Sequence, residues 1–296
     1  MKSISKTLKI SITLIAVSLV LTILISEKLK VDKPVFIKNY KEVEIIESEG
    51  SLSISGFDIE LKYISNIEDK RKVVYITFKD APELNFYASE TNSMGLMSFY
   101  DYSNDNVERH GRYGVHTVFL SLNHENFEYD LNKELELGEA TITFNDGLIM
   151  DVDLGKILLH KYSDEKTPLQ DSGVEGSSDG NSRSIFWATD YIMISNVYSP
   201  LFEEAKDLFD FNINKLGSMN KKDLIYNKNE NLFFSFQFYN IDDIEKKLCS
   251  YEIKPVIYFV DRSGKEYEKR VYNTFNYKPY FSFSDIYKYL KVKEEI

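Results

Sequence analysis

Cysteine is almost missing from this chain of 296 residues, which contains one, Cys249. A single cysteine cannot form a disulfide within the chain, and it cannot build a zinc site from several thiolates. A small secreted fold held together by disulfides is therefore excluded. No histidine stands near Cys249 in the sequence to activate it, so we expect an inert, buried thiol.

The usual signatures of catalysis and cofactor binding are also missing. The sequence contains no phosphate-binding loop, no GxGxxG, no GxSxG and no HExxH motif. A Ser-x-x-Lys pattern occurs at Ser3–Lys6, but it lies in the short tail before the first apolar segment, so we assign no chemistry to it. The sequence predicts no cofactor and no metal ion, and its motifs identify no reaction.

Positive charge is scarce outside the first nine residues. The whole chain carries 36 Lys and Arg against 47 Asp and Glu, a formal charge of −11. Removing the three lysines of residues 1–9 leaves 33 basic and 47 acidic residues, or −14. Nucleic-acid binding depends on Lys and Arg that neutralise phosphates, so such an acidic body argues against a nucleic-acid partner. The same reasoning argues against broad contact with an anionic lipid surface.

The one long apolar run is Ile10–Ser26, which contains no charged residue. As a helix it would cover about 25 Å, at the short end of what crosses a bilayer, and flanking Lys9 and Lys28 can extend its reach. It exceeds the apolar core of a typical signal peptide, and Leu24 fits a cleavage site poorly. We therefore predict an uncleaved transmembrane anchor in the lipid bilayer, with a cleaved signal peptide as the alternative.

The orientation of this anchor follows from the order of a basic tail and an apolar core, which is that of an export signal. Residues 1–9 are too few for a cytoplasmic domain, so we expect the C-terminal body to be extracytoplasmic, at the cell membrane. Lysines are also frequent after the apolar run, and a simple lysine count would favour the opposite orientation. That rule is weak for long translocated domains.

Apolar residues alternate with polar ones over much of the remaining chain, which predicts a mainly β fold. Residues 140–154 alternate on both sides of Asn145-Asp146-Gly147, so we expect a β-hairpin there, and a second one over 256–272. Further strands are predicted at 52–63 with a bulge at Gly56, and at 73–78, 84–88, 113–122, 185–197 and 232–239. Short helices are expected after caps at Ser199 and Ser284-Asp285, and over 240–250.

Composition divides the chain into segments. The N-terminal part reads as a basic tail over 1–9, the anchor over 10–26 and a charged juxtamembrane stalk over 27–45. Residues 164–183 are rich in Gly, Ser, Asp, Glu and Asn, which predicts a flexible linker. The linker would separate a β domain over 46–163 from a second β domain with short helices over 184–296. Many short strands with turns between them favour two β-sandwich-like domains.

The candidate ligand-binding residues are aromatic. The chain contains 21 Tyr and 20 Phe, and two clusters stand out, one at 99–102 and the other at 275–281. Exposed aromatic rings offer stacking surfaces for sugars and anchor points for protein partners. We therefore single out Tyr100, Tyr102, Tyr277 and Tyr280 as contacts for an envelope protein or glycan, with ordinary core packing as the alternative.

Histidines and paired carboxylates offer weaker candidates. His116 and His124 bracket a strand and a turn and, with a carboxylate, would suit zinc, but their spacing is not diagnostic. Asp151 and Asp153 lie on one face of the predicted hairpin, and paired carboxylates can perform acid–base chemistry when burial separates their pKa values. Here the pattern places them on the polar face, where we expect them to be solvated.

One oxygen-rich stretch resembles part of a calcium loop. Asp101, Ser103 and Asp105 have the spacing of its first three ligands. Asn106 replaces the required glycine, and Arg112 stands where the loop needs a glutamate, so an EF-hand is excluded. We prefer to interpret the stretch as a polar loop rich in turn formers, with a looser calcium site as the alternative.

Together these features favour a membrane-anchored extracytoplasmic protein that acts as a non-enzymatic binding, sensing or accessory module. A cell-envelope hydrolase that uses Asp and His residues is the alternative, and a structural component of an envelope assembly is a third hypothesis. Two carboxylates, or a histidine and a carboxylate, that converge in a deep pocket would favour the hydrolase. A large exposed apolar patch or a free sheet edge would favour the assembly component.

Overall fold

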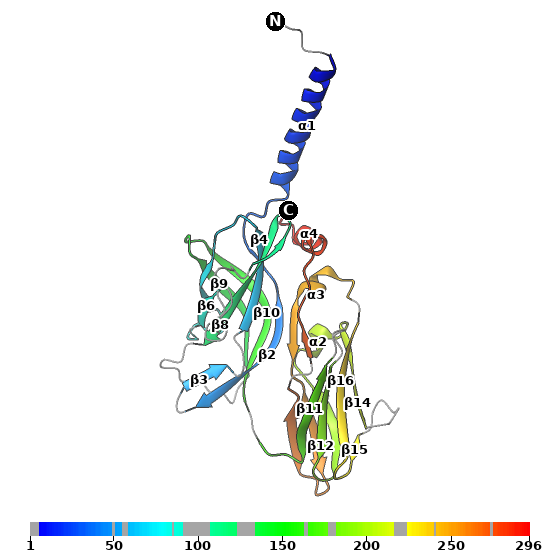
Figure 1. The fold of residues 1–296 in the computed structure, drawn as a ribbon. Coiled ribbons are helices and arrows are strands. Elements are labelled where there is room, and N and C mark those ends of the chain that lie inside the picture. Colours follow the sequence, from blue (N-terminus) through cyan, green and yellow to red (C-terminus); the bar gives the residue numbers. More distant parts are fainter. Residues whose placement is uncertain are drawn as a thin grey trace, which may run out of the picture.

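The computed structural model shows a long N-terminal helix followed by a β-rich body (Figure 1). The structure describes residues 6–48, 51–54, 59–84, 86–90, 107–122, 134–162, 165–176, 182–215, 224–239, 241–272 and 275–296. Strands far outnumber helices and form three sheets, so the predicted mainly β fold is confirmed.

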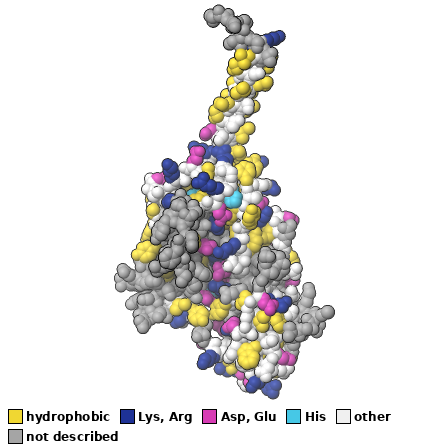
Figure 2. Space-filling view, in the orientation of Figure 1, with side chains coloured by type: hydrophobic (Ala, Val, Ile, Leu, Met, Phe, Trp, Pro, Cys, Tyr) yellow, Lys and Arg dark blue, Asp and Glu magenta, His cyan; other side chains and the backbone are white. Residues whose placement is uncertain are grey.

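Helix α1 spans Lys6–Lys28 and carries the apolar run. Its 23 residues extend for about 35 Å at about 1.5 Å per residue, which is enough to cross the hydrocarbon core of a bilayer. Leu, Ile and Val side chains around the helix are more than half exposed, because the helix projects away from the body (Figures 1 and 2). The helix is therefore long and apolar enough to span a membrane.

The residues that follow α1 are packed into the body, where the sequence predicted a stalk over 27–45. Val31 is only 1% exposed. Its backbone N donates to Asn66 Oδ1 at 3.1 Å, and Asn66 Nδ2 donates to Val31 O at 2.6 Å. Tyr113 Oη donates to Leu29 O at 2.8 Å. Within the range predicted as a stalk, the apolar residues between the lysines enter the core and the sheet.

Twelve strands form the first sheet. Ten follow one another in the order β1-β4-β8-β6-β5-β9-β10-β2-β17-β20, while β3 pairs with β2 and β7 pairs with β8. Most neighbours are antiparallel, but β2 runs parallel to both β10 and β17. The strands are β1 (Val35–Phe36), β2 (Asn39–Ser48), β3 (Ser51–Ile54), β4 (Ile59–Asn66), β5 (Val73–Phe78), β6 (Phe86–Ser89), β7 (Val107–His110), β8 (Tyr113–Leu122), β9 (Leu135–Phe144), β10 (Ile149–Lys161), β17 (Ser250–Ile253) and β20 (Phe275–Tyr277).

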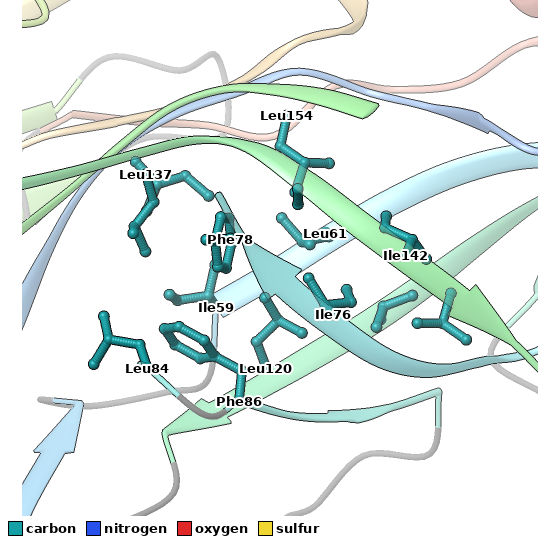
Figure 3. Packing of buried hydrophobic residues seen from close by; sticks show 14 of the residues in the cluster. Ile59, Leu61, Ile76, Phe78, Leu84, Phe86, Leu120, Leu137, Ile142 and Leu154 are labelled. Atoms are coloured by element: carbon teal, nitrogen blue, oxygen red, sulfur yellow. The ribbon is translucent and has the colours of Figure 1, made fainter. Parts of the chain in front are cut away.

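This sheet curls around one hydrophobic core. The core takes side chains from strands as distant in the sheet order as β1 and β10. Alternate residues such as Ile76 and Phe78 of β5, Ile142 of β9 and Leu120 of β8 point into the same space (Figure 3). Because successive side chains of a strand point to opposite faces, the alternation in the sequence records this core.

Both predicted hairpins are present. Strands β9 and β10 meet at Asn145–Leu148, where Gly147 has a φ of 89°. Strands β18 (Val256–Asp261) and β19 (Glu266–Arg270) form the second hairpin, and Gly264 in its turn has a φ of 84°. Positive φ is easily reached by glycine, so these turn residues fix the strand register as predicted.

Two four-stranded sheets pack face to face below the first sheet (Figure 1). Their orders are β11-β12-β16-β14 and β15-β13-β18-β19, and one core fills the space between them. The remaining strands are β11 (Leu169–Gly176), β12 (Ser182–Ala188), β13 (Ile192–Tyr198), β14 (Phe209–Lys215), β15 (Ile225–Tyr226) and β16 (Asn231–Phe238).

The segment predicted as a flexible linker, 164–183, contains strand β11, which pairs with β12 along its whole length. Backbone hydrogen bonds to β12 hold residues 169–176 in place, although the polar composition of the segment suggested a loop. Strands β17 and β20, which lie within the predicted second domain, belong to the first sheet. The division into two domains remains a prediction.

The described residues of the body also form three short helices: α2 (Phe202–Ala205), α3 (Ile244–Leu248) and α4 (Phe283–Val292). Asp243 caps α3 and Ser282 caps α4 through their side chains. The predicted helix after Ser199 is a single turn, and Ser199 Oγ accepts from Leu201 N at 3.1 Å just before it. The cap of α4 is therefore Ser282 rather than the predicted Ser284-Asp285.

A buried carboxylate joins the first sheet to the sheets below it. Glu42 on β2 is fully buried, and it accepts hydrogen bonds from Lys254 N and from Ser199 Oγ, the latter at 3.2 Å. Arg270 Nη1 lies 3.5 Å from Glu42 Oε1 and donates to Lys254 O at 2.9 Å. Burial raises the pKa of Glu42 to about 7, despite the bonds from Lys254 and Arg270 that lower it.

Candidate binding surface

An exposed apolar patch crosses four strands on the outer face of the first sheet. Tyr87 on β6 pairs with Tyr75 on β5, Tyr75 pairs with Thr143 on β9, and Thr143 pairs with Ile149 on β10. Tyr75 is 46% exposed, while Tyr87 and Ile149 are each 64% exposed. The register therefore sets two tyrosines and an isoleucine in one row across the sheet.

A bulge in β5 adds Val74 to this row. The register between β5 and β9 shifts between Val73 and Tyr75, so Val74 and Tyr75 both face outward, while Val73 and Ile76 are buried. Val74 is 50% exposed. Two successive outward residues widen the apolar surface, which is a recognised effect of bulges. We call Val74, Tyr75, Tyr87 and Ile149 the outer patch.

Polar groups border the outer patch on the same face. Thr141 lies beside Thr77 and Asp151 in the next row of the sheet, and its Oγ1 donates to Asp151 Oδ1 at 2.7 Å. Lys79 Nζ lies 3.0 Å from Asp151 and 3.3 Å from Glu139. The hydrogen bond from Thr141 and the one from Lys79 lower the pKa of Asp151. An apolar centre with a charged border is the usual anatomy of a protein interface.

No protein-family model matches this chain, and no curated protein matches it. Function must therefore be inferred from the geometry of the described residues. The outer patch is one candidate, and the residues singled out from the sequence are others.

The four tyrosines predicted as ligand contacts differ in whether the structure describes them and in how exposed they are. Tyr100 and Tyr102 lie outside the described residues. Tyr277 is half-buried, donates its hydroxyl to Lys247 O at 2.9 Å and lies 6.2 Å from the Tyr251 ring. Burial raises the pKa of Tyr277. Tyr280 is 81% exposed. Tyr277 therefore packs and bonds within the body, while Tyr280 is open to solvent, and a ligand-binding role for the four residues stays a prediction.

Asp151 and Asp153 project from one face of β10, as predicted, and form separate ion pairs. Asp151 pairs with Lys79, and Asp153 pairs with Lys38 at 2.5 Å. Their side chains are 62% and 55% exposed. Burial acts to raise the pKa of Asp153, but hydrogen bonds from Lys38 and from Gly155 N lower it overall. Both carboxylates are solvated and have lowered pKa values, so the pair lacks the separation of pKa values that acid–base chemistry needs.

A serine, a histidine and a glutamate meet at the rim of the first sheet. His116 Nε2 lies 3.0 Å from Ser65 Oγ, and its Nδ1 lies 3.7 Å from Glu90 Oε2. The Tyr63 ring stacks on the imidazole at 4.5 Å, and the Tyr63 hydroxyl donates to Glu90 Oε1 at 2.7 Å. This order of contacts is the one a hydrolytic triad uses. A groove of about 990 Å³, lined mainly by charged residues, reaches His116.

Burial prevents these three residues from acting as a triad in this structure. Ser65 is 1% exposed, and its hydroxyl also bonds to Asn66 O at 3.1 Å. His116 is 5% exposed, with one face covered by Tyr63. A nucleophile must reach a carbonyl carbon, and a hydroxyl on a residue that is 1% exposed is poorly placed to do so. We therefore read the cluster as a hydrogen-bonded support for the sheet rim.

The remaining predicted sites lie partly outside the described residues. His124 and the calcium-like residues Asp101, Ser103 and Asp105 lie outside the described residues. Within the described part of the chain, no group of three or more His, Cys, Asp or Glu is placed to hold a metal ion. Cys249 is buried, and burial raises the pKa of its thiol to about 11. A thiol that stays protonated is a poor nucleophile, as expected from the sequence.

The sequence missed the outer patch, although part of the signal was present. Leu148, Met150 and Val152 alternate inward along the predicted hairpin, which leaves Ile149 as an apolar residue on the polar face. Tyr75 gave no such signal, because residues 73–76 are all apolar or aromatic and no pattern shows which of them face solvent. The bulge that turns both Val74 and Tyr75 outward comes from pairing with β9, a contact between distant parts of the chain.

Proposed function

We propose that this protein is a membrane-anchored, non-enzymatic binding module that docks a protein partner on the outer patch. The observation that carries the proposal is the exposed row of Tyr87, Tyr75 and Ile149, widened by Val74. Tyrosines surrounded by aliphatic side chains are typical centres of protein interfaces. Helix α1 supplies the anchor, with the body on the extracytoplasmic side.

The composition of the patch favours a protein over a glycan. Sugar rings stack on aromatic faces and need hydroxyl or charged partners around them. Val74 and Ile149 are half or more exposed, and they offer a sugar neither stacking nor hydrogen bonds. A protein side chain can desolvate both of them. At about 25 cal/mol per Å² of apolar surface buried, such contacts give a protein partner a gain that a glycan lacks.

A photo-crosslinking amino acid at Thr143 would test this docking site. Thr143 stands between Tyr75 and Ile149 in the row, so a docked partner must lie within reach of it. In native membranes we expect a discrete crosslinked protein at this position. The same probe at Met193, which is 40% exposed on a different sheet, should give none.

Two pairs of substitutions separate the possible ligands. Tyr75→Ser with Tyr87→Ser should reduce the crosslink at least tenfold, and Val74→Ser with Ile149→Ser should reduce it by a similar factor. If only the tyrosine pair reduces the crosslink and the captured material is carbohydrate, the ligand is a glycan and the proposed protein partner is wrong. If the crosslink persists in both variants, the outer patch is not the docking site. Tyr198→Ser, at a half-exposed tyrosine of β13, is the matched control.

A further inference from the structure

Helix α4 presents a second face that the body does not cover. Its inner face, Ile286, Tyr289 and Leu290, is at most 1% exposed and packs in the core that also contains Val31. Residues spaced by about four and seven positions share one side of a helix. On that basis Ser284, Lys288 and Lys291 form one outer face, and all three are exposed.

Exposed apolar residues flank this basic face. Phe283 is 45% exposed and Val292 is 53% exposed, although each stands at an end of a well-packed helix. The apolar face of α4 packs in the core, so the surface it leaves for a membrane is the lysine side, bordered by these two apolar residues. Lysine side chains reach phosphate groups, while the apolar neighbours enter the acyl boundary.

The contacts around α1 place α4 close to the membrane end of the body. Lys28 ends α1, and only Leu29 and Lys30 separate it from the buried Val31. Three extended steps span about 10 Å at most, and a headgroup layer is about 5–7 Å thick on each side of a bilayer. The core around Val31, on which α4 packs, therefore lies next to the headgroup layer whenever α1 spans the membrane.

The base of α4 is also fixed to this end of the body. The rings of Phe283 and Tyr113 lie 5.8 Å apart, and the Tyr113 hydroxyl holds Leu29 at the end of α1. Figure 1 shows α4 and the C-terminus beside the base of α1. The position of α4 relative to the anchor thus depends on a chain of direct contacts.

The end of the body next to α1 is less acidic than the rest of the body, so it is better suited to contact a phospholipid surface. Lys28, Lys30 and Lys33 are exposed, as are Lys288 and Lys291, and Figure 2 shows dark blue side chains where the helix meets the body. Five exposed acidic residues share the region: Glu27, Asp32, Glu68, Glu294 and Glu295. The membrane end is therefore close to neutral, while the chain after residue 9 carries −14. Electrostatic repulsion by anionic lipids is weakest here.

We infer that the outer face of α4 is a second membrane contact, in which Lys288 and Lys291 bind phospholipid phosphates beside the anchor. The inference rests on the proposed insertion of α1 and is independent of any docked partner. The contact would hold the body at a fixed tilt and present the outer patch at a constant height above the bilayer. The occupant of this face is thus the same bilayer that holds α1.

Headgroup quenching in nanodiscs tests this contact. The full chain, with Cys249→Ser, is placed in discs of phosphatidylcholine and phosphatidylglycerol that contain a lipid with a nitroxide headgroup. An NBD fluorophore is attached at Ser284→Cys on α4, or at Asp190→Cys in the β12–β13 turn. That turn lies at the end of β13 opposite Ser199, which contacts the first sheet through Glu42. We expect at least threefold stronger quenching at residue 284 than at residue 190.

A charge-reversal pair supplies the second readout. Lys288→Glu with Lys291→Glu should bring the quenching at residue 284 close to that at residue 190. Lys166→Glu with Lys228→Glu, which changes the net charge equally at exposed positions in the lower part of the body, should leave it unchanged. Equal quenching at residues 284 and 190 in the unmodified lysine background would overturn the inference while the anchor stands. A chain that fails to enter the discs at all would overturn the anchor and this contact together.

Discussion

At the scale of single residues, Gly155 is the clearest case of a position where the backbone conformation and packing require glycine. It has a φ of 91° and lies in the irregular part of β10, between Asp153 and Ile157, where pairing with β9 shifts register. A Cβ atom at Gly155 would overlap the backbone oxygen and nitrogen of Asn39 on β2. Two requirements therefore meet at one position, a left-handed conformation and a close approach of two strands.

We predict that Gly155→Ala destabilises the protein by about 2–4 kcal/mol, since strained conformation and backbone overlap add to each other. Gly147→Ala is the matched control. Gly147 has nearly the same φ, 89°, but a Cβ there meets nothing within 4 Å, so only about 1 kcal/mol is expected. Thermal unfolding of the detergent-solubilised chain measures both. Equal losses for the two variants would show that the approach to Asn39 is not tight.

The sequence predicted only in part which residues face solvent and which are buried. Ile149 could be placed outward from the hairpin pattern alone, because the turn at Asn145–Leu148 fixes the register. Glu42 and His116 could not be placed inside, since charged and titratable residues in alternating strands usually face water. Their burial depends on partners far away in sequence, such as Lys254 for Glu42.

At the scale of elements, local signals were sufficient where a turn or a cap is encoded by neighbouring residues. The two hairpins and strands β5 and β8 follow the predicted ranges. Strands β1, β2 and β11 were missed for a different reason. Strand β1 consists of only two apolar residues, while β2 and β11 are rich in polar residues, so none of them gives a clear alternation. They become strands because other strands supply the hydrogen bonds.

The cap of α4 allows a test of one element. Ser282 Oγ accepts from Asp285 N at 3.1 Å and lies 2.7 Å from Asp285 Oδ2, while Ser284 is an exposed helical residue. We expect Ser282→Ala to cost about 1 kcal/mol and Ser284→Ala to cost almost nothing. The unfolding midpoints of the two variants provide the comparison. A larger loss of stability for Ser284→Ala than for Ser282→Ala would show that Ser284 is the cap, as the sequence predicted.

At the scale of the whole molecule, Glu42 couples the first sheet to the sheets below it and makes that coupling depend on pH. Its pKa of about 7 in the folded protein lies above the usual 4.5, so the folded state favours the protonated form. The stability from this group is fully present below pH 4.5 and is lost as pH rises through about 7. The loss amounts to roughly 3 kcal/mol at most, since one pKa unit corresponds to about 1.4 kcal/mol.

We predict that Glu42→Gln becomes more stable relative to the wild type as pH rises from 5 to 8, as measured by melting temperature. The comparison is needed because burial lowers the pKa of His160 to about 3, and that group makes stability rise with pH over the same range. The variant stays neutral, so it should be more stable than the wild type at pH 8 and similar to it at pH 5. Glu175→Gln, in an exposed ion pair with Arg183, should retain the wild-type slope. A difference in melting temperature between Glu42→Gln and the wild type that stays constant over this range would mean that Glu42 is ionised throughout.

The architecture of the whole molecule was predictable as a class and not as a topology. A mainly β body behind an apolar helix followed from alternation and composition. The parallel pairing of β2 with β10 and β17 did not, because it joins residues that lie far apart in the sequence. The packing of the residues just after α1 has the largest consequence for function. The contacts of Val31 and Leu29 hold the body directly at the end of α1.

Membrane docking of this protein requires that α1 is retained in the mature chain and inserted in a lipid bilayer. The most direct measurement is the intact mass of the protein recovered from cell membranes after an alkaline carbonate wash. We predict a membrane-bound species that still carries residues 1–28 and that only detergent releases. A soluble product, whether it lacks those residues or retains them, would contradict the account.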